Sequence, residues 1–332
     1  MTFPDPIFSL LIALVAALLS AGLIYLLRPL LLRYALARPN ARSSHRLPTP
    51  QGAGIAVIAA TLAVAGGCSA VVHPAIPPVV FAAALLISLV GAADDIRSIP
   101  VVPRLLLQAV AVGAVVFTAP TELRVIPLLP IGIERGLIFM TGIWFVNLVN
   151  FMDGLDWMTV AEVVPVAGAI VLLGLLGKLA PPATAAAAAL CGAVLGFAPF
   201  NRPVAKVFLG DVGSLSIGLL LGWCLLQLAY EQHLAATLLL PLYYLSDATA
   251  TLVRRIARRE PFWTAHRSHF YQRATDNGLS VLRVVGEVFT LNVFLAALAI
   301  ASSVVTSRFF TAILLSAGGI AVAFVMTRFS RK

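Results

Sequence analysis

The 332-residue chain is 60% hydrophobic and only 11% charged, whereas soluble globular chains are about 45 to 50% apolar and about 25% charged. This composition excludes a soluble globular protein and predicts an all-α, polytopic integral membrane protein, with residues 1–332 forming a single membrane-embedded domain. A net charge of +9 would favour nucleic-acid binding in a soluble domain, but in a membrane protein it is expected to report topology, so no nucleic-acid partner is predicted.

A bilayer crossing needs about 20 mostly apolar residues, and the sequence contains about eleven such runs. The predicted spans are residues 8–27, 53–72, 75–93, 104–119, 136–152, 158–177, 182–200, 213–230, 234–253, 285–302 and 309–327. Between the fourth and fifth spans, residues 120–135 are expected to form a hairpin at the membrane surface, because the apolar piece 125–133 is short and contains Pro127 and Pro130.

The 23 Lys and Arg residues are divided unequally between the two sides of the predicted bundle. One side holds only Arg124, Arg135, Lys178 and Arg308, so the loops of the opposite side hold the remaining 19 of the 23. Because basic residues are retained in cytoplasmic loops, the side with 19 is predicted to be cytoplasmic. The N-terminus is then outside and the C-terminus cytoplasmic.

Half of the 14 acidic residues fall on the predicted cytoplasmic side. They are Asp94, Asp95, Asp153, Asp156, Asp211, Glu260 and Asp276. A single carboxylate at the end of a helix can be a solvated cap. The five aspartates at span ends, however, all face one compartment, which favours a shared site for a metal ion and a polyanion.

Asp94 and Asp95 end the third predicted span. Adjacent aspartates point to different faces of a helix, so one could hold a metal while the other caps or binds a second group. Carboxylates of this kind hold Mg²⁺ beside substrate phosphates. The alternative is a turn with two solvated acids.

A second polar motif runs from Asn147 to Asp156. Gly154 is predicted to interrupt it, so that the fifth helix ends near Asp153 with Asn150 on the same face. Asp156 would then begin the sixth helix, where a capping role competes with a catalytic one.

A third motif joins the seventh and eighth spans. It contains Lys206 and, further on, Asp211 between Gly210 and Gly213. Glycines beside a helix N-terminus suit the close approach of a phosphate, and Lys206 can act as a point charge for the same group. Asp211 could instead only cap the eighth helix.

The segment 254–283 is the longest and most basic of the predicted cytoplasmic loops. Arg254, Arg255, Arg258 and Arg259 recur at helical spacing, which anchoring at the membrane surface explains. Residues 266–273, here named the basic segment, contain His266, Arg267, His269 and Arg273. His266 and His269 are expected to share a helical face with Arg273 and to suit a phosphate. A zinc site is not favoured, because the HExxH pattern is absent.

Together these motifs resemble one family. They are Pro39-Asn40, Arg42-Ser43 and His45 to Pro50, then Gly52 and Gly54, Asp94-Asp95, Asn147 to Asp156, and Asn201 to Ser214. In this order and in these loops they are similar to the polyprenyl-phosphate N-acetylhexosamine-1-phosphate transferases of glycosyltransferase family 4. The resemblance covers nearly the whole chain and rests on several ordered motifs, so it is specific.

The resemblance implies an enzyme of the bacterial inner membrane that transfers a sugar 1-phosphate from a UDP-N-acetylhexosamine to undecaprenyl phosphate and releases UMP. It also implies eleven spans, an outside N-terminus, a cytoplasmic site and a Mg²⁺ cofactor. Loops 28–52, 94–104, 150–157, 201–212 and 254–284 would form the active site. Besides the two substrates and membrane lipid, a second copy of the chain is a candidate partner.

Residue by residue, the resemblance assigns Asp211 as the Mg²⁺ ligand, with Asp94 a second candidate ligand. The implied catalytic residues are Asp94, Asp95, Asp153 and Asp156, with Asp94 the candidate base. The implied substrate-binding residues are Asn147, Asn150, Lys206, His266, Arg267, His269 and Arg273. Asp247 also matches an acidic position of the family.

The basic segment departs from one branch of the family. Peptidoglycan-branch members carry three consecutive histidines where this chain has His266-Arg-Ser-His269, a form that resembles the members initiating O-antigen. The implied sugar is therefore GlcNAc, FucNAc or QuiNAc, with a phospho-MurNAc-pentapeptide transferase as the alternative. A secondary transporter is the alternative of another class, although transporters place their acids near the bilayer midplane within inverted repeats.

Overall fold

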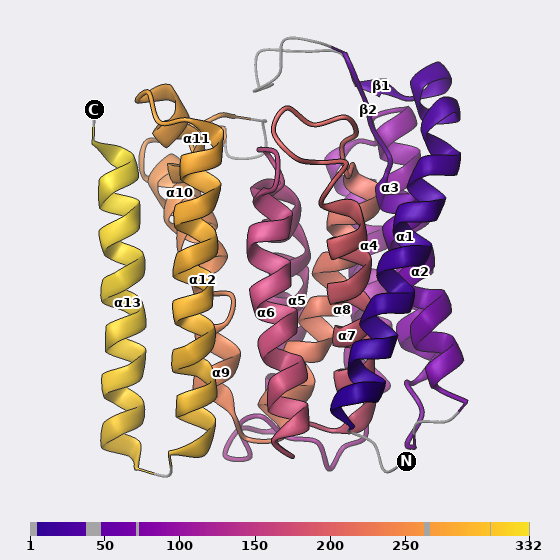
Figure 1. The fold of residues 1–332 in the computed structure, drawn as a ribbon. Helices are drawn as coiled ribbons and strands as arrows, with labels where there is room; N and C mark the ends of the chain where they lie inside the picture. Colours follow the sequence, from indigo (N-terminus) through magenta and orange to yellow (C-terminus); the bar gives the residue numbers. More distant parts are fainter. Residues whose placement is uncertain (1–4, 38–47, 71–72, 262–265, 306, 332) are drawn as a thin grey trace.

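A computed structural model describes residues 5–37, 48–70, 73–261, 266–305 and 307–331, which are almost entirely α-helical (Figure 1). The helices are α1 (Pro6–Tyr34), α2 (Gly54–Cys68), α3 (Pro78–Ile96), α4 (Val101–Phe117), α5 (Ile131–Met152), α6 (Met158–Leu175), α7 (Pro181–Phe197), α8 (Asp211–Tyr230), α9 (Leu234–Leu239), α10 (Leu242–Ala257), α11 (Phe270–Asp276), α12 (Val281–Val304) and α13 (Arg308–Ser330). Two short strands, β1 (Leu36–Ala37) and β2 (Thr49–Pro50), pair antiparallel. The motif residues between 39 and 47 lie outside the described residues.

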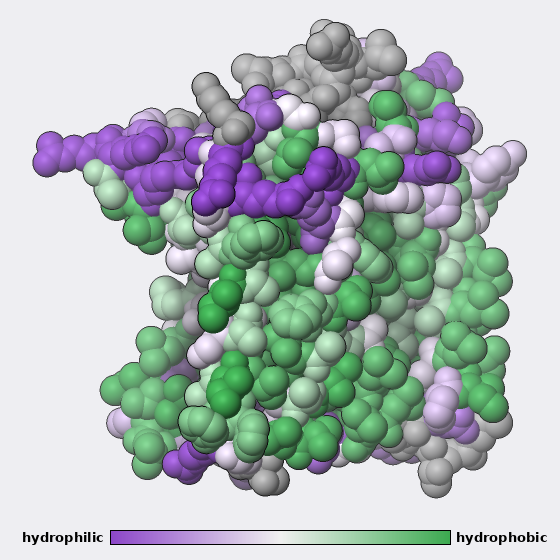
Figure 2. Space-filling model, turned by 60° about the vertical axis from the view of Figure 1, so that its left-hand side comes forward, coloured by the Kyte–Doolittle hydropathy of each residue, from purple (hydrophilic) through white to green (hydrophobic). Residues whose placement is uncertain are grey.

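The helices form a membrane-embedded bundle. Among the described residues, α1, α3, α5, α6, α8, α12 and α13 are long and apolar enough to cross a bilayer, and α2, α4 and α7 are shorter apolar helices. In α1 and α13 only 28% and 22% of the membrane-length window is buried, against 83% in α8, so α8 is central and α1 and α13 face lipid. Figure 2 shows hydrophilic surface gathered at the upper end of one face and hydrophobic surface over most of the rest. The prediction of an all-α polytopic membrane protein is confirmed.

The ninth predicted span, 234–253, is not one continuous helix. It is divided at Pro241 into α9 and α10, because proline has no backbone N–H to continue a helix. The following helix is also amphipathic, with Asp247 buried and Val253 and Ile256 exposed, so its pattern differs from that of a uniformly apolar span. The segment still passes from the lower to the upper part of the bundle (Figure 1).

The hairpin predicted over residues 120–135 is shorter than expected, because α5 already begins at Ile131. Buried Arg135 lies in the first turns of α5 and donates to the carbonyl oxygens of Pro120 and Leu123 at 2.7 and 3.0 Å. It also donates to the hydroxyl of Tyr230 at the end of α8. Glu134, the neighbouring residue of α5, accepts hydrogen bonds from the backbone N–H groups of Val125 and Ile126, so two side chains of the following helix hold the connection.

Glycines allow the central helices to approach each other closely. A Cβ atom on Gly54 of α2 would overlap the backbone of Gly213 in α8, and one on Gly91 of α3 would lie 2.5 Å from the backbone of Asp211. In the same way, Gly192 and Gly196 of α7 lie directly against the backbone of α1. Small residues at such crossings are typical of helix packing in membranes, where van der Waals contact replaces the hydrophobic effect.

The two termini lie at opposite ends of the bundle (Figure 1). At the upper end in that view, α3 and α5 end, α6 and α8 begin, and α11 caps the neighbouring helices. We name it the acidic end, because Asp94, Asp95, Asp153 and Asp211 lie there. The described parts of the five loops predicted to form the site all reach this end.

Candidate active site

Asp95 fixes the beginning of α8. Its carboxylate accepts hydrogen bonds from the backbone N–H groups of Asp211 and Val212 at 2.9 and 3.2 Å, and from the side-chain amide of Gln51. The first N–H groups of a helix have no partner within the helix, so Asp95 caps α8 from a different helix. Gly210 makes room for this carboxylate, since its φ is +80° and a Cβ atom there would overlap Asp95.

Asp211 is the first residue of α8, and its side chain is turned away from the cap position. Its carboxylate accepts a hydrogen bond from Nδ2 of Asn150 at 2.9 Å, and it lines a polar pocket. The interpretation of Asp211 as only a helix cap is therefore wrong, because Asp95 performs that task.

Asp94 is paired with Arg104, a residue of the predicted loop 94–104 for which the sequence predicts no individual role. Its carboxylate accepts hydrogen bonds from the backbone N–H of Ile99 and from Nη1 of Arg104 at 2.7 Å. The same guanidinium lies 3.6 Å from Asp211, and the carboxyl groups of Asp94 and Asp211 are within hydrogen-bonding reach of each other. Arg104 thus neutralises part of the charge that the crossing of α3 and α8 brings together.

The polar pocket has a volume of about 150 Å³. It is lined by Gln51, Asn150, Asp153, Phe208, Gly210, Asp211 and Ser214, which come from the end of α5, the start of α8 with the loop before it, and the residue after β2. Asn150 links two of the lining residues of α8, because its Nδ2 donates to Asp211 and also to Oγ of Ser214 at 2.9 Å. The predicted placement of Asn150 and Asp153 on one face near the end of the fifth helix agrees with the structure.

Asp153 ends α5, and its carboxylate accepts a hydrogen bond from the hydroxyl of Thr159. Burial raises the pKa of Asp153 to about 6, the hydrogen bond from Thr159 opposes the shift, and the charges of Asp95 and Asp156 add to it. The carboxyl group of Asp153 therefore lies in a poorly hydrated place, where a nearby cation would stabilise its charged form.

The donor set of the pocket fits Mg²⁺. Among the described residues, no group of three or more His, Cys, Asp or Glu side chains could hold a metal ion. Mg²⁺, however, is usually held by one or two carboxylates while water and substrate phosphates supply the other ligands. Asp211 meets this requirement directly, because it lines the pocket, whereas Asp94 is engaged by Arg104.

Asp156 is turned towards the loop that joins α7 and α8. The residue is buried, and its Oδ2 accepts a hydrogen bond from the backbone N–H of Ala205 at 3.0 Å. The prediction that Asp156 begins the sixth helix is wrong, because α6 begins at Met158; of the two roles left open for Asp156, the structure does not support the cap, since Trp157 occupies the N-cap position. Asp156 does not line the polar pocket, although its charge acts on Asp153.

Asn150 is the one predicted substrate-binding residue that lines the polar pocket, and Asn147 and Lys206 are among the six that do not. Asn147 is buried one turn further into the bundle, where its Nδ2 donates to Gln108 of α4 at 2.7 Å and to the carbonyl of Ile143. Lys206 is exposed on the loop between α7 and α8. The structure thus separates Asn147 from the acidic cluster and leaves Lys206 facing the surroundings of the acidic end.

The basic segment is organised by Asp247. This carboxylate of α10 has no exposed surface and accepts hydrogen bonds from Nδ1 of His269 at 3.1 Å and from the backbone N–H groups of Phe270 and Tyr271 at 3.0 and 3.2 Å. Like Asp95, it caps a helix from outside, here α11. The sequence signalled Asp247 only by resemblance.

The histidines of the basic segment are adjacent, but not through helical spacing. The rings of His266 and His269 are 5.0 Å apart, whereas α11 begins only at Phe270, so the predicted shared helical face with Arg273 is wrong. Arg273 lies over the Phe270 ring, and Arg267 pairs with Asp276 at 3.1 Å. The segment therefore presents its cations from a turn and the first turns of a short helix.

The sequence was also compared with known proteins. The sequence model of glycosyl transferase family 4 matches residues 77–229, the stretch from α3 to α8 that supplies most of the pocket. Over this stretch the chain is similar to glycosyl transferase family 4.

Individual proteins extend the similarity over most of the chain. A probable undecaprenyl-phosphate N-acetylglucosaminyl 1-phosphate transferase of Bacillus subtilis is 25% identical over 84% of this chain and 83% of its own. A decaprenyl-phosphate N-acetylglucosaminephosphotransferase of Mycobacterium tuberculosis is 29% identical over 88% and 81%. A phospho-N-acetylmuramoyl-pentapeptide-transferase of Gluconacetobacter diazotrophicus is 33% identical over 47% and 48%.

Proposed function

We propose that this protein transfers an N-acetylhexosamine 1-phosphate from a UDP-sugar to undecaprenyl phosphate and releases UMP. Two of the relatives described above are named for the transfer of N-acetylglucosamine phosphate to a polyprenyl phosphate. The observation that carries the proposal is the polar pocket, in which Asp153 and Asp211 meet neutral donors at the end of a membrane bundle. A reaction between two phosphorylated substrates, one of them a lipid, needs a polar site at the end of the membrane-spanning helices.

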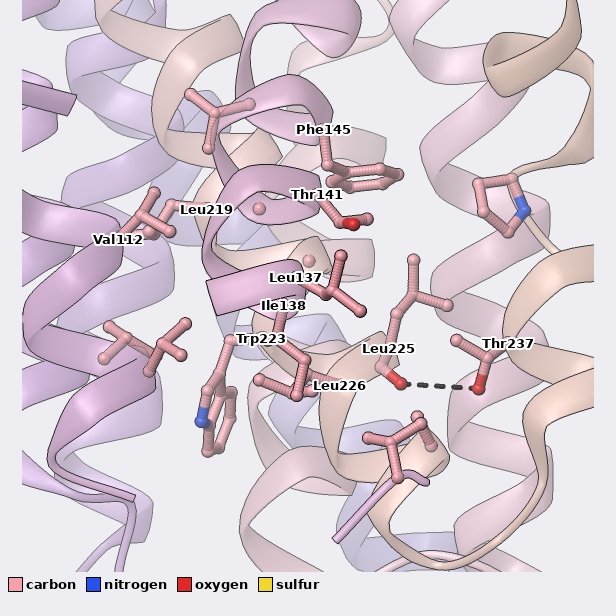
Figure 3. A pocket seen from close by; sticks show the side chains of 18 of the residues that line it. Val112, Leu137, Ile138, Thr141, Phe145, Leu219, Trp223, Leu225, Leu226 and Thr237 are labelled. Carbon is pink, nitrogen blue, oxygen red and sulfur yellow. Dashed lines mark hydrogen bonds between the residues drawn. The ribbon is translucent and has the colours of Figure 1, made fainter. Parts of the chain in front are cut away.

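An apolar cavity below the polar pocket suits the chain of the lipid acceptor. It has a volume of about 280 Å³ and lies among α4, α5, α8, α9 and the start of α10. Leu137, Phe145 and Trp223 point into it in Figure 3, which also shows the hydrogen bond from Thr237 to the carbonyl of Leu225. Apolar walls of this kind bind hydrocarbon.

The two cavities are lined by neighbouring turns of the same two helices, α5 and α8. Val146 of the apolar cavity lies one turn from Asn150 of the polar pocket, and Gly218 lies one turn from Ser214. A phosphate in the polar pocket could therefore remain joined to an isoprenoid chain in the apolar cavity. This proximity supports a lipid phosphate as the acceptor.

Asp211 would hold Mg²⁺, with Asp94 as a second ligand once Arg104 releases it. A bound Mg²⁺ would neutralise the charge of the donor diphosphate. Asn150 orients the Asp211 carboxylate by its hydrogen bond. The monoester phosphate of the acceptor is mostly ionised at neutral pH, since its second pKa is about 6, so Asp94 is needed for positioning more than as a base.

The basic segment and the exposed Lys206 would hold the phosphates of the two substrates. His266, Arg267, His269 and Arg273 provide the cations, and Asp247 orients the imidazole of His269. Charge-assisted hydrogen bonds from such groups are short and strong. In this proposal the acidic end faces the cytoplasm of a bacterial inner membrane, which agrees with the position of most arginines.

Within this reaction class we propose initiation of an envelope glycan such as O-antigen, with GlcNAc, FucNAc or QuiNAc as the sugar. The His266-Arg-Ser-His269 form supports this choice. The partial similarity to a phospho-N-acetylmuramoyl-pentapeptide-transferase keeps the peptidoglycan reaction as the second candidate.

The deciding experiment measures UMP release by the purified protein in lipid nanodiscs, with undecaprenyl phosphate and each UDP-sugar in parallel, with Mg²⁺ or with EDTA. We expect release from an N-acetylated UDP-hexosamine, its loss in EDTA and its loss in Asp211→Asn. Release only from UDP-MurNAc-pentapeptide would replace the proposal with the peptidoglycan reaction. The absence of release from every sugar would refute it.

A further inference from the structure

Tyr271 connects two parts of the acidic end that are far apart in the sequence. Its side chain is fully buried, and its hydroxyl donates to the carbonyl oxygen of Phe151 in the last turn of α5 at 3.1 Å. The hydroxyl oxygen of Tyr271 also lies against Gly154. A Cβ atom added to Gly154 would overlap this oxygen and would lie 3.1 Å from Cζ of the Tyr271 ring. The absence of a side chain at Gly154 is thus what admits the hydroxyl.

These two contacts bracket Asp153. Phe151 precedes it by two residues and Gly154 follows it directly, so the hydroxyl of Tyr271 holds the backbone on both sides of a carboxylate that lines the polar pocket. Burial, together with the charges of Asp247 and Asp153, raises the pKa of Tyr271 well above its ordinary value. The hydroxyl is therefore protonated and acts as a donor.

The opposite end of Tyr271 belongs to the basic segment. Its backbone N–H donates to Asp247 at 3.2 Å, and its ring stacks on that of His269 with centroids 5.7 Å apart and planes inclined by 24°. Asp247 in turn accepts the hydrogen bond from Nδ1 of His269. One residue therefore touches both the histidine and the backbone around Asp153.

We infer that Tyr271 is a positioning residue that docks the basic segment onto the turn at Asp153 and Gly154, and so fixes the separation between the phosphate-binding cations and the carboxylates of the polar pocket. The functional part of this inference rests on the proposed transferase activity. A buried tyrosine usually finds a hydrogen-bond partner. Here, however, the partner lies next to the pocket, and a glycine provides space for the hydroxyl alone.

The test is a double-mutant cycle of Gly154→Ala and Tyr271→Phe. Gly154→Ala forces the Ala Cβ against the hydroxyl, so it should lower both the Tm in detergent and the kcat for UMP release. Tyr271→Phe loses one hydrogen bond, worth about 1 kcal/mol, and should lower kcat about fivefold with little change in the KM for the UDP-sugar. In the double variant the oxygen is gone and the ring needs to move only slightly, so Tm and kcat should exceed those of Gly154→Ala alone.

Tyr244→Phe provides a matched control. Tyr244 is also fully buried, and its hydroxyl also donates to a carbonyl oxygen, that of Met158, at 3.1 Å, but it is not among the nearest neighbours of Gly154. Tyr244→Phe should therefore not restore the Tm or the kcat of the Gly154→Ala variant. Equal rescue by Tyr244→Phe, or additive losses of Tm in the double variant, would overturn the docking inference.

The two readouts separate this inference from the proposed function. If the wild-type protein releases UMP from no UDP-sugar, the transferase proposal fails. The coupling between the Tm changes of Gly154→Ala and Tyr271→Phe still tests whether Tyr271 docks the basic segment. If coupling in Tm is present but Tyr271→Phe leaves kcat unchanged, Tyr271 only stabilises the fold and the positioning role is refuted.

Discussion

Two aspartates at the acidic end perform tasks that their sequence context does not distinguish. Asp95 accepts backbone N–H groups of α8, while Asp211 offers its carboxylate to the pocket. Asp95 lies in the last turn of α3 and Asp211 is the first residue of α8. From the sequence alone, either carboxylate could serve as a helix cap. Which one caps depends on the crossing of α3 and α8, and that crossing joins segments that lie 116 residues apart.

This division of tasks predicts different defects for two substitutions. Asp95→Ala removes the cap of α8 and should lower the free energy of unfolding by about 1 kcal/mol or more. Asp211→Asn keeps an oxygen for Asn150, so its Tm in detergent should stay close to that of the wild type, while UMP release falls on the order of 100-fold. Thermal unfolding and UMP release are measured on the same preparations of both variants. A larger loss of Tm in Asp211→Asn than in Asp95→Ala would contradict the assignment of Asp95 as the cap of α8.

The pKa of Asp153 predicts a pH-dependent stability. It is raised from 3.8 to about 6 in the folded protein, so between these values the folded chain holds a proton that the unfolded chain has lost. The contribution of Asp153 to stability therefore falls as the pH rises from about 4 to about 6. Asp153→Asn removes this effect and should raise the Tm relative to the wild type at pH 7.5, but not at pH 4.

The measurement needs EDTA in the buffer, because a bound cation would offset the charge. A difference in Tm between Asp153→Asn and the wild type that is the same at both pH values would show that Asp153 is not the group responsible. The variant should at the same time lose activity, which is a common relation between stability and function at a buried charged site.

At the scale of helices, the site depends on how closely α3 can approach α8. A methyl group at Gly91 would lie 2.5 Å from the backbone of Asp211. Gly91→Ala should therefore force the helices apart, lower the free energy of unfolding by about 1 to 3 kcal/mol and reduce UMP release. Gly168→Ala in α6 is the control, because nothing lies within 4 Å of its Cβ position, and it should stabilise slightly through helix propensity. Similar losses in both variants would refute the packing argument.

A buried polar pair joins α6 to α12. Asn292 donates to Glu162 at 2.7 Å, and both residues are almost completely buried. Within the described part of the chain, Oε1 of Glu162 and Oδ1 of Asn292 have no hydrogen-bond partner. Glu162→Gln supplies a neutral side chain of the same shape and should preserve or raise the Tm, whereas Glu162→Ala should lower stability by about 1 to 3 kcal/mol. A lower Tm for Glu162→Gln than for Glu162→Ala would contradict this account.

The sequence predicts the elements well where one rule decides them. Apolar runs of spanning length locate α1, α5, α6 and α13, and the break at Gly154 separates α5 from α6. The rule fails at 234–253, where an apolar count does not register the missing N–H of Pro241 or the change to an amphipathic pattern in α10. It also fails to reveal Arg104, whose role appears only when α3 and α4 bring it against Asp94.

At the scale of the whole molecule, the sorting of basic residues predicts which end faces the cytoplasm. Lys206 is exposed at the acidic end and Glu231 is exposed at the opposite end, just after α8. In inside-out vesicles an impermeant maleimide should label Lys206→Cys but not Glu231→Cys, and in right-side-out vesicles the reverse. The natural cysteines are buried or partly buried, so the background should be low. The opposite labelling pattern would invert the proposed topology.

The packing of α1 on α7 has a consequence for how the protein is made. Gly192 and Gly196 receive the backbone of α1, yet α7 is synthesised about 150 residues after α1 ends. The first helix must therefore remain in the bilayer without its main partner while five further helices are inserted. Its apolar sequence, mostly facing lipid even in the folded protein, allows it to remain in the bilayer alone, and the contact between α1 and α7 forms only after α7 has been inserted.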